Sequence, residues 1–313
     1  MSALPDNIRS RIESLGIPFE LKGTVKTSMN HIERETWILE YEGSQFVYVA
    51  GQKNVTLGWD THQCPLGDGV LHDLREYFEQ GQEYYQDQMD DMKEYYAKQI
   101  MKSDAKKADK LRAELAEELD NLKEEMHDAG CTNWANFMAK WNAHLSECLS
   151  PLRTADIGDL IVEVDCRYLE QDAPSLAEAV RSLKEGPFTL ATEDEWEYLC
   201  NGGARTLFRW GDTLCDILPE IFNVGCVSDV REKSILEQAN MLGLFIAYNS
   251  YKYEIIDNTL YVKGGDGGCS LCGGDGAIYV LPCYTAFYRE QMNEYDHSLS
   301  NNYFCYRRII RLP

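Results

Sequence analysis

Two cysteines lie three positions apart in the glycine-rich segment Gly264–Gly276. The spacing of Cys269 and Cys272 lets two thiolates bind one zinc ion, and the flanking glycines ease the tight turn. The sequence has no second pair at this spacing, so the residues left to complete a tetrahedral site are Cys283, His297 and Cys305. A redox pair and a loop with ordinary buried thiols are the alternatives. No helix N-terminus is evident there to lower a thiol pKa. The Lys-Ser/Thr of a phosphate-binding loop is also missing, so nucleotide binding is not indicated.

The elements that position these residues begin with a short helix and two strands. Ile8, Ile12 and Leu15 recur at helical spacing. The segment 37–41 then alternates apolar and polar residues, Gly43 turns the chain, and 46–50 is an apolar run. These patterns predict a helix followed by neighbouring strands, and residues 1–45 are interpreted as an N-terminal helix-strand extension.

Residues 71–150 are predicted to be helical. The chain contains neither Gly nor Pro between Gly81 and Gly130, and apolar residues recur every three or four positions. Two amphipathic helices separated by the polar Ser103–Lys107 stretch would satisfy the pattern, as would one long bent helix. A third helix carries Trp134 and Trp141 on one face. We interpret the segment as a helical insertion that packs on the main domain; a partner-binding coiled-coil arm is the alternative.

Composition restricts the classes of function. The 313 residues include 52 acidic and 30 basic side chains, giving a formal net charge of -22. Such a surface repels phosphate backbones and anionic lipid, so neither nucleic acid nor membrane is expected as a partner. No signal peptide is visible at the start, no apolar run reaches membrane-spanning length, and the eleven cysteines are scattered. We therefore expect a cytoplasmic protein with mostly reduced thiols. The oligomeric state is not indicated.

The most informative segment is a helix start followed by a glycine pair. Thr192 with Glu195 three residues later forms a capping box, which predicts a helix that carries Trp196 inward. Gly202 and Gly203 tolerate positive φ and end it. Further motifs occur in the order Val47-Tyr-Val-Ala-Gly51, Leu57-Gly-Trp-Asp60, Phe208-Arg-Trp-Gly-Asp212, Asn240-Met-Leu-Gly-Leu244, Lys263-Gly-Gly265 and Arg308-Ile-Ile-Arg311.

This series of motifs resembles the formylglycine-generating-enzyme family, also called sulfatase-modifying factors. The resemblance covers roughly 46–70 and 156–313 and implies a divergent member with a C-type-lectin-like fold. The expected fold class is α+β, with small antiparallel sheets interrupted by the helical insertion. The expected organisation is the extension 1–45, a formylglycine-generating-enzyme-like domain of 46–70 and 151–313, and the insertion 71–150.

The resemblance also implies a test for the family's chemistry. Catalytic members oxidise a substrate cysteine with oxygen and a copper ion held by two cysteines four residues apart, and soft thiolates suit Cu(I). In this sequence Cys283 stands near the first position, but Phe287 occupies the second. Cys305 is the other thiol that the fold could bring near. A second catalytic branch binds iron through histidines, for which this chain offers His72, His127 and His144, without a His-x-x-x-His pair. Solvated surface histidine is the alternative.

The calcium-binding segment of the family also has a counterpart. Its loop offers oxygen ligands to Ca²⁺, and the corresponding stretch Tyr248–Ile255 retains Asn249 and Glu254 with two residues inserted between them. Ca²⁺ and Zn²⁺ are therefore the metals to consider, with copper or iron only for an oxidase.

Three functional hypotheses remain. The first is a non-catalytic recognition module that binds a protein or small-molecule ligand through aromatic and glycine-rich loops between residues 248 and 306. Tyrosine supplies contact area there at low entropic cost. The second is a metal-dependent oxidase or oxygenase with rearranged ligands drawn from Cys269, Cys272, Cys283 and Cys305. A structural component of a larger assembly, joined through the helical segment, is a third possibility.

Overall fold

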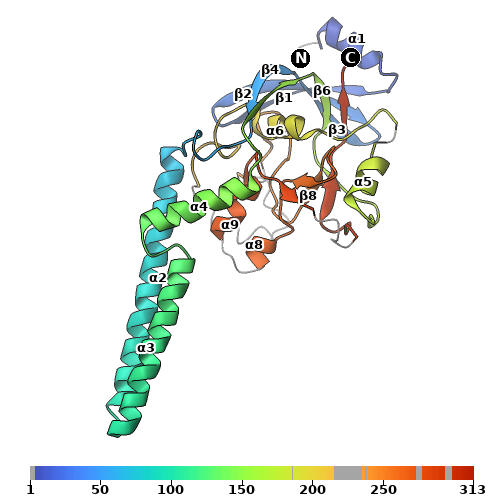
Figure 1. Cartoon of the computed structure of the whole chain (residues 1–313). Coiled ribbons are helices and arrows are strands. Elements are labelled where there is room, and N and C mark those ends of the chain that lie inside the picture. Colours follow the sequence, from blue (N-terminus) through green and yellow to red (C-terminus); the bar gives the residue numbers. More distant parts are fainter. Residues whose placement is uncertain (1–3, 185, 215–234, 237, 273–276, 293–297) are drawn as a thin grey trace. The chain divides into compact units, whose positions relative to one another are not determined.

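The computed structural model describes residues 4–184, 186–214, 235–236, 238–272, 277–292 and 298–313 (Figure 1). The chain divides into two compact units, one of Met1–Gly67 with Cys148–Pro313 and one of Asp68–Glu147. The first combines small sheets with helices, which confirms the α+β class. No helix of the described residues is long and apolar enough to cross a membrane.

The first sheet has the strand order β1-β2-β3-β6-β12, and all its neighbours are antiparallel. Its strands are β1 (Glu20–Met29), β2 (Ile32–Tyr41), β3 (Ser44–Val49), β6 (Leu160–Glu163) and β12 (Ile309–Arg311). The turn between β2 and β3 has positive φ at both Glu42 (+49°) and Gly43 (+75°), as a two-residue hairpin requires. Residues 1–45 therefore contribute two strands to the sheet that also contains β3 and β6.

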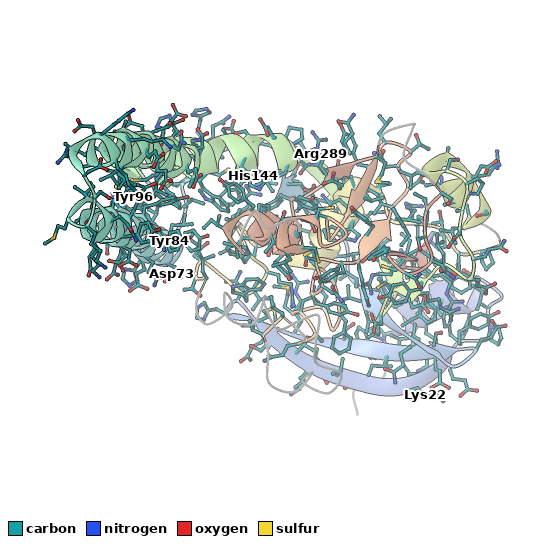
Figure 2. All side chains as sticks on the ribbon, turned by 90° about the horizontal axis from the view of Figure 1, so that it is seen from below. Lys22, Asp73, Tyr84, Tyr96, His144 and Arg289 are labelled. Atoms are coloured by element: carbon teal, nitrogen blue, oxygen red, sulfur yellow. The ribbon has the colours of Figure 1, made fainter. Side chains whose placement is uncertain are left out.

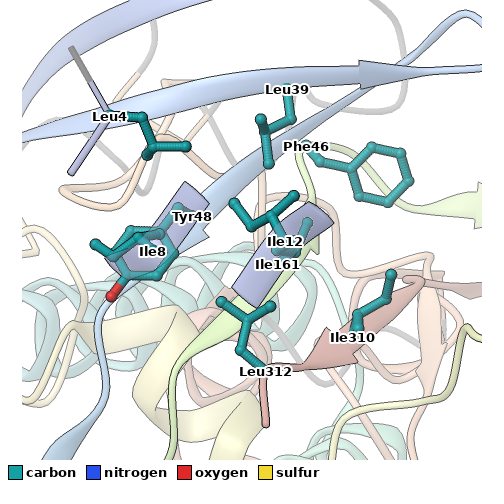
Figure 3. Close-up of a cluster of buried hydrophobic side chains, with 9 residues drawn as sticks. All are labelled: Leu4, Ile8, Ile12, Leu39, Phe46, Tyr48, Ile161, Ile310 and Leu312. Atoms are coloured by element: carbon teal, nitrogen blue, oxygen red, sulfur yellow. The ribbon is translucent and has the colours of Figure 1, made fainter. Parts of the chain in front are cut away.

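Helix α1 (Asp6–Glu13) covers one face of this sheet. Ile8 and Ile12, one turn apart, are 9% and 5% exposed. They pack with Phe46 and Ile161 of the central strands in a cluster whose other members are Leu4, Leu39, Tyr48, Ile310 and Leu312 (Figure 3). Each fully buried aliphatic side chain contributes about 1.5–3 kcal/mol. This cluster fixes the N-terminal segment to the strands on either side of the helical unit in sequence.

The second sheet has the order β10-β9-β8-β11-β7 and positions the candidate site. Its strands are short: β7 (Arg167–Tyr168), β8 (Tyr253–Ile255), β9 (Tyr261–Lys263), β10 (Glu290–Gln291) and β11 (Phe304–Tyr306). The pair β8–β11 is parallel and the other pairs are antiparallel. A third sheet pairs β4 (Gln52–Leu57) with β5 (Arg153–Ile157). Besides α1 and α6 (Glu193–Asn201), the described residues of this unit include the short helices α5 (Leu176–Ser182), α8 (Cys269–Cys272), α9 (Ala277–Val280) and the 3₁₀ helix Leu281–Tyr284.

Helix α6 (Glu193–Asn201) confirms the capping-box prediction. The Thr192 hydroxyl accepts a hydrogen bond from the backbone N–H of Glu195, and the Glu195 carboxylate accepts one from the N–H of Thr192. The helix ends at Gly202, whose φ is +61°. Trp196 is fully buried, as expected.

A second motif supports the C-terminal end of the same helix. The side chain of Asn240 is fully buried and donates hydrogen bonds to the carbonyls of Leu199 (2.6 Å) and Cys200 (2.9 Å). Its Oδ1 accepts hydrogen bonds from the N–H groups of Leu242 and Leu244, both at 3.0 Å. Because a buried amide is stable only when its donors and acceptors are bonded, this motif residue has a structural role.

The helical unit contains two long antiparallel helices, α2 (Asp68–Ile100) and α3 (Ala105–Asp128), and α4 (Trp134–Cys148) begins in it (Figure 1). The sequence allowed two separate helices or one long bent helix, and the structure has two separate helices. The break is earlier than predicted, because the Asp104 carboxylate caps α3 by accepting from the N–H of Lys107. Tyr96 is buried and its hydroxyl donates to Glu118 across the pair, whereas Tyr84 is 58% exposed (Figure 2).

Candidate functional site

The second sheet brings two distant cysteines to one small cavity. Cys305 of β11 lies opposite Tyr168 of β7, and Cys166 stands two residues before Tyr168. Because side chains alternate along a strand, Cys166 and Cys305 lie on the same face. The thiol of Cys305 is fully buried and forms a hydrogen bond with Cys166, which is partly exposed.

A lysine lies beside this thiol pair. The Nζ atom of Lys252 is 3.9 Å from Sγ of Cys166 and donates a hydrogen bond to the hydroxyl of Tyr248. It also lies 4.6 Å from the ring centroid of Tyr248 and 5.0 Å from that of Tyr168, within cation–π range. In the described part of the chain, no carboxylate forms an ion pair with this ammonium. Burial would lower the pKa of Lys252, but Cys166 and Tyr248 raise it above its ordinary value, so the ammonium form is held.

The cavity at this point has a volume of about 10 Å³, which is close to the room that one water molecule needs. Two of the residues proposed from the sequence as calcium ligands line it together with Cys305. The complete lining consists of Cys166, Ile246, Ala247, Tyr248, Asn249, Lys252, Glu254, Gly264 and Cys305. The structure thus brings Asn249, Glu254 and Cys305 together.

The two calcium candidates are already engaged. Oδ1 of Asn249 accepts a hydrogen bond from the N–H of Tyr251 at 2.9 Å. Glu254 is 4% exposed, and its carboxylate accepts hydrogen bonds from Arg307 at 3.0 and 3.5 Å. Burial would lower the pKa of Arg307, but Glu254 raises it. Since both carboxylate oxygens face one guanidinium, Glu254 stabilises β8 against β11 in this arrangement.

Cys269 and Cys272 lie elsewhere on the loop face, on the short helix α8, and both are exposed. The sequence did not indicate this helix turn. The Asp266 carboxylate accepts hydrogen bonds from the N–H groups of Gly268 (2.8 Å) and Ser270 (3.0 Å). Burial and then Asp266 raise the pKa of Cys269, which opposes thiolate formation. His297 and residues 273–276 lie outside the described residues.

Cys283 is buried in the 3₁₀ helix, at 1% exposure, and burial raises the pKa of its thiol. The Phe287 ring, which stands where the family has its second copper ligand, is 1% exposed and lies 5.6 Å from the ring of Trp59. The positions of Cys283 and Phe287 therefore offer one thiol and one phenyl ring, which does not fit a copper ion held by two thiolates. At the other thiol pair, the ammonium of Lys252 lies beside Cys166 and would repel a cation held there. The arrangement does not fit two-thiolate copper.

The histidines proposed as iron ligands are separate. Among the described residues, the one group of three metal-ligating side chains is His72, Asp73 and Glu76 on α2, within 4.8 Å of one another and exposed in part. His127 and His144 do not belong to it. Exposed acidic groups of this kind are common without a metal.

Glycines with positive φ hold two tyrosines against the loop. A Cβ atom on Gly268 (φ +80°) would lie 2.1 Å from a ring carbon of Tyr251, and one on Gly267 (φ +69°) would lie 2.7 Å from Tyr253. These distances are far below van der Waals contact. The glycine-rich sequence is therefore required for the tyrosine rings to lie directly on the loop backbone.

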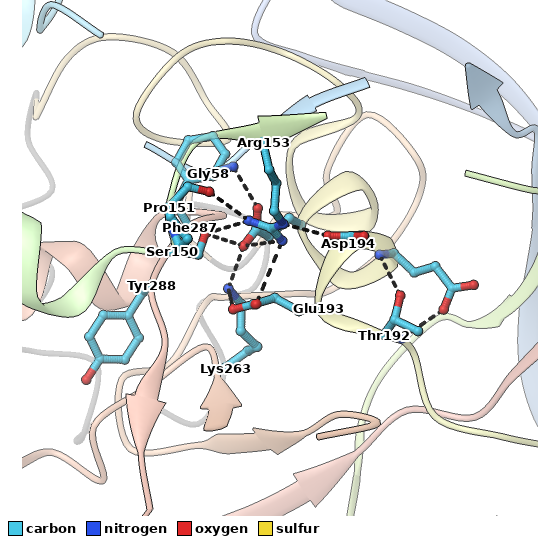
Figure 4. A network of polar contacts seen from close by, with 12 residues as sticks. Gly58, Ser150, Pro151, Arg153, Thr192, Glu193, Asp194, Lys263, Phe287 and Tyr288 are labelled. Atoms are coloured by element: carbon cyan, nitrogen blue, oxygen red, sulfur yellow. Dashed lines mark hydrogen bonds and ion pairs between the residues drawn. The ribbon is translucent and has the colours of Figure 1, made fainter. Parts of the chain in front are cut away.

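A buried ion-pair network anchors the start of this loop (Figure 4). Lys263 and Glu197 are both fully buried, with Nζ 3.0 Å from Oε1. Arg153 lies 3.2 Å from the same carboxylate, and Ser150 and Gly58 donate hydrogen bonds to it at 2.5 and 2.9 Å. Burial would raise the pKa of Glu197, but Lys263 and Arg153 lower it. Lys263, which begins the Lys-Gly-Gly motif, is thus a structural cation.

Comparison with known proteins found no match among protein-family models, curated proteins or solved structures.

Cys166 was not predicted from the sequence, and Tyr248 and Lys252 were included only as part of the loop face 248–306. Cys166 and Cys305 are joined only through strand pairing, and neither occurs in a short spacing pattern. The spacing of four positions between Tyr248 and Lys252 offered a signal, because a Tyr and a Lys at this spacing can contact each other within one turn.

Proposed function

We propose that this chain is a non-catalytic recognition module with a C-type-lectin-like core of the formylglycine-generating-enzyme type. Its ligand, a protein segment or small molecule, binds at the loop face between residues 248 and 306. The observation that carries the proposal is the Lys252 ammonium, held against two tyrosine rings without an ion-paired carboxylate among the described residues. Such a cation can bind a carbonyl or carboxylate oxygen of a ligand.

The surroundings of Lys252 support contact with a ligand. Tyr168 and Tyr303 are each 44% exposed, and Tyr303 precedes the strand that pairs with β7 and β8. Rigid tyrosine rings give large contact area with little loss of rotamer entropy. The glycines under Tyr251 and Tyr253 preorganise the face, which reduces the entropic cost of binding.

The thiols support a role without metal-dependent oxidase chemistry. Cys283 and Cys305 are fully or almost fully buried, and burial raises both pKa values above the ordinary value of a thiol. A neutral buried thiol is a poor metal ligand. The cysteines that the oxidase hypothesis required come from three elements: α8 for Cys269 and Cys272, the 3₁₀ helix for Cys283 and β11 for Cys305.

The test is an array of short peptides and glycans that carry carboxylate, sulfate or neutral carbonyl groups, probed with the full chain. We expect binders whose affinity falls at least about tenfold, or about 1.4 kcal/mol, in Lys252→Gln. Lys53→Gln is the matched control, because Lys53 is 77% exposed on β4 and forms a surface ion pair with Asp156. An array on which every binder tolerates Lys252→Gln and Tyr168→Ala would overturn the proposal.

A further inference from the structure

Cys166 and Cys305 differ in a way that suits two successive steps of thiol chemistry. Both are free thiols at the same 10 Å³ cavity. Cys166 is partly exposed, so a small oxidant from solvent can reach it, whereas Cys305 is fully buried and reaches only its neighbours. The two sulfurs are already hydrogen-bonded.

A cation lies beside the sulfur of Cys166. The ammonium of Lys252 lies 3.9 Å from its sulfur, and a nearby cation stabilises the thiolate, which is the reactive form of cysteine. The hydroxyl of Tyr248 bonds to the same ammonium and keeps it in place. Acidic groups lie close by as well: Asp165 is 3.4 Å from the Tyr248 hydroxyl, and the carboxylate of Glu254 is bound by Arg307.

Joining the two sulfurs requires a local movement of the backbone. Cys166 lies just outside β7, which has two residues, and Cys305 is a diagonal neighbour across the β7–β11 pair. Disulfide geometry requires the two β-carbons to approach closely. Because β7 is so short, only a small segment has to shift.

We propose that Cys166 and Cys305 form a redox-active dithiol that reduces a hydroperoxide. The Cys166 thiolate attacks one peroxide oxygen, the O–O bond breaks, and the leaving oxygen takes a proton to become water or an alcohol. Cys166 is then a sulfenic acid. The sulfur of Cys305 attacks it, an S–S bond forms, and the thiol proton leaves with the hydroxide as water. The dithiol loses two electrons and the peroxide gains them; a small thiol reductant restores the dithiol.

The other neighbouring pair provides an internal comparison. Cys269 and Cys272 are more exposed than Cys166, but Asp266 lies beside Cys269 and raises its pKa. If exposure alone decided reactivity, peroxide would oxidise that pair first. The proposal predicts the opposite order. It does not depend on the recognition function, because oxidation is measured on the protein without ligand.

The experiment treats the reduced full chain with equimolar hydrogen peroxide, blocks remaining thiols with an alkylating reagent, and maps the peptides by mass spectrometry. We expect a Cys166–Cys305 disulfide as the first product. Cys305→Ser should stop at a Cys166 sulfenic acid, which dimedone traps. Lys252→Gln should slow the reaction at least about tenfold, because it removes the cation beside the attacking sulfur. Cys269→Ser should change nothing.

Two results would overturn the inference. One is a Cys269–Cys272 disulfide formed while Cys166 and Cys305 remain open to alkylation after unfolding. The other is oxidation of Cys166 at the same rate in Lys252→Gln as in the wild type. Cys305→Ala serves as a second variant, so that poor folding of one substitution at this buried site does not decide the result.

Discussion

The ammonium of Lys252 lies 3.9 Å from the sulfur of Cys166, although the two residues are 86 positions apart in the chain. Lys252 directly precedes β8, and Cys166 directly precedes β7. Both elements pair with β11, in parallel and antiparallel directions respectively. Strand β11, which lies between β8 and β7 in the second sheet, thus creates the contact, and any change that shifts β11 is expected to separate the two groups.

Gly268→Ala is predicted to disturb the tyrosine face. Its new methyl group would lie 2.1 Å from the Tyr251 ring, and alanine is strained at a φ of +80°. The expected loss is about 1–3 kcal/mol in the free energy of unfolding, measured by urea denaturation. Gly158→Ala is the control, since nothing lies within 4 Å of its Cβ position. Equal effects of the two substitutions would contradict the packing described for the loop.

Glu197→Gln is predicted to be strongly destabilising. It leaves the fully buried Lys263 without its main carboxylate partner, and breaking a buried pair costs about 3–5 kcal/mol. Asp156→Asn, which removes an exposed pair with Lys53, should cost less than about 1 kcal/mol. Thermal and urea unfolding measure both. A mild effect of Glu197→Gln would show that Glu193, 3.6 Å from Lys263, compensates.

Acid should weaken the first sheet through Glu163. Burial would raise the pKa of this carboxyl, but hydrogen bonds from Arg308 and Arg167 lower it below its ordinary value. A lowered folded pKa stabilises the protein above the unfolded value of about 4.3, and this contribution disappears as pH falls through the folded pKa. Glu163→Gln should therefore reduce the loss of stability between neutral and acidic pH, measured by unfolding at each pH. If the free energy of unfolding changed with pH in the same way for the variant and the wild type, the proposed role of Glu163 would be contradicted.

Local patterns predicted the local elements well. The Thr192–Glu195 capping box is present as expected, because its residues are adjacent and need no distant partner. The hairpin at Gly43 and the two long helices also follow from sequence-local rules of turn geometry and helical periodicity. The C-type-lectin-like assignment stays a prediction, since strand order depends on pairings between distant segments.

The candidate site was harder to predict from the sequence, because it too depends on pairing between distant segments. Cys305 was a candidate, but its thiol partner Cys166 is brought close only by the antiparallel pairing of β11 with β7. The Cys269-x-x-Cys272 spacing was the more visible signal, and it lies on a separate helix turn with its own capping carboxylate. Asn249 and Glu254 do line the cavity, yet their oxygens bond to the chain itself.

The most direct test of the recognition proposal is ligand protection of Cys166 from alkylation. Cys166 is partly exposed beside Lys252, and Cys64, partly exposed near Arg205, is the internal reference. With the tightest-binding peptide or glycan from the array at saturation, we predict that maleimide labelling of Cys166 slows at least about tenfold while labelling of Cys64 is unchanged. Unchanged labelling of both cysteines at saturating ligand would contradict binding at this face.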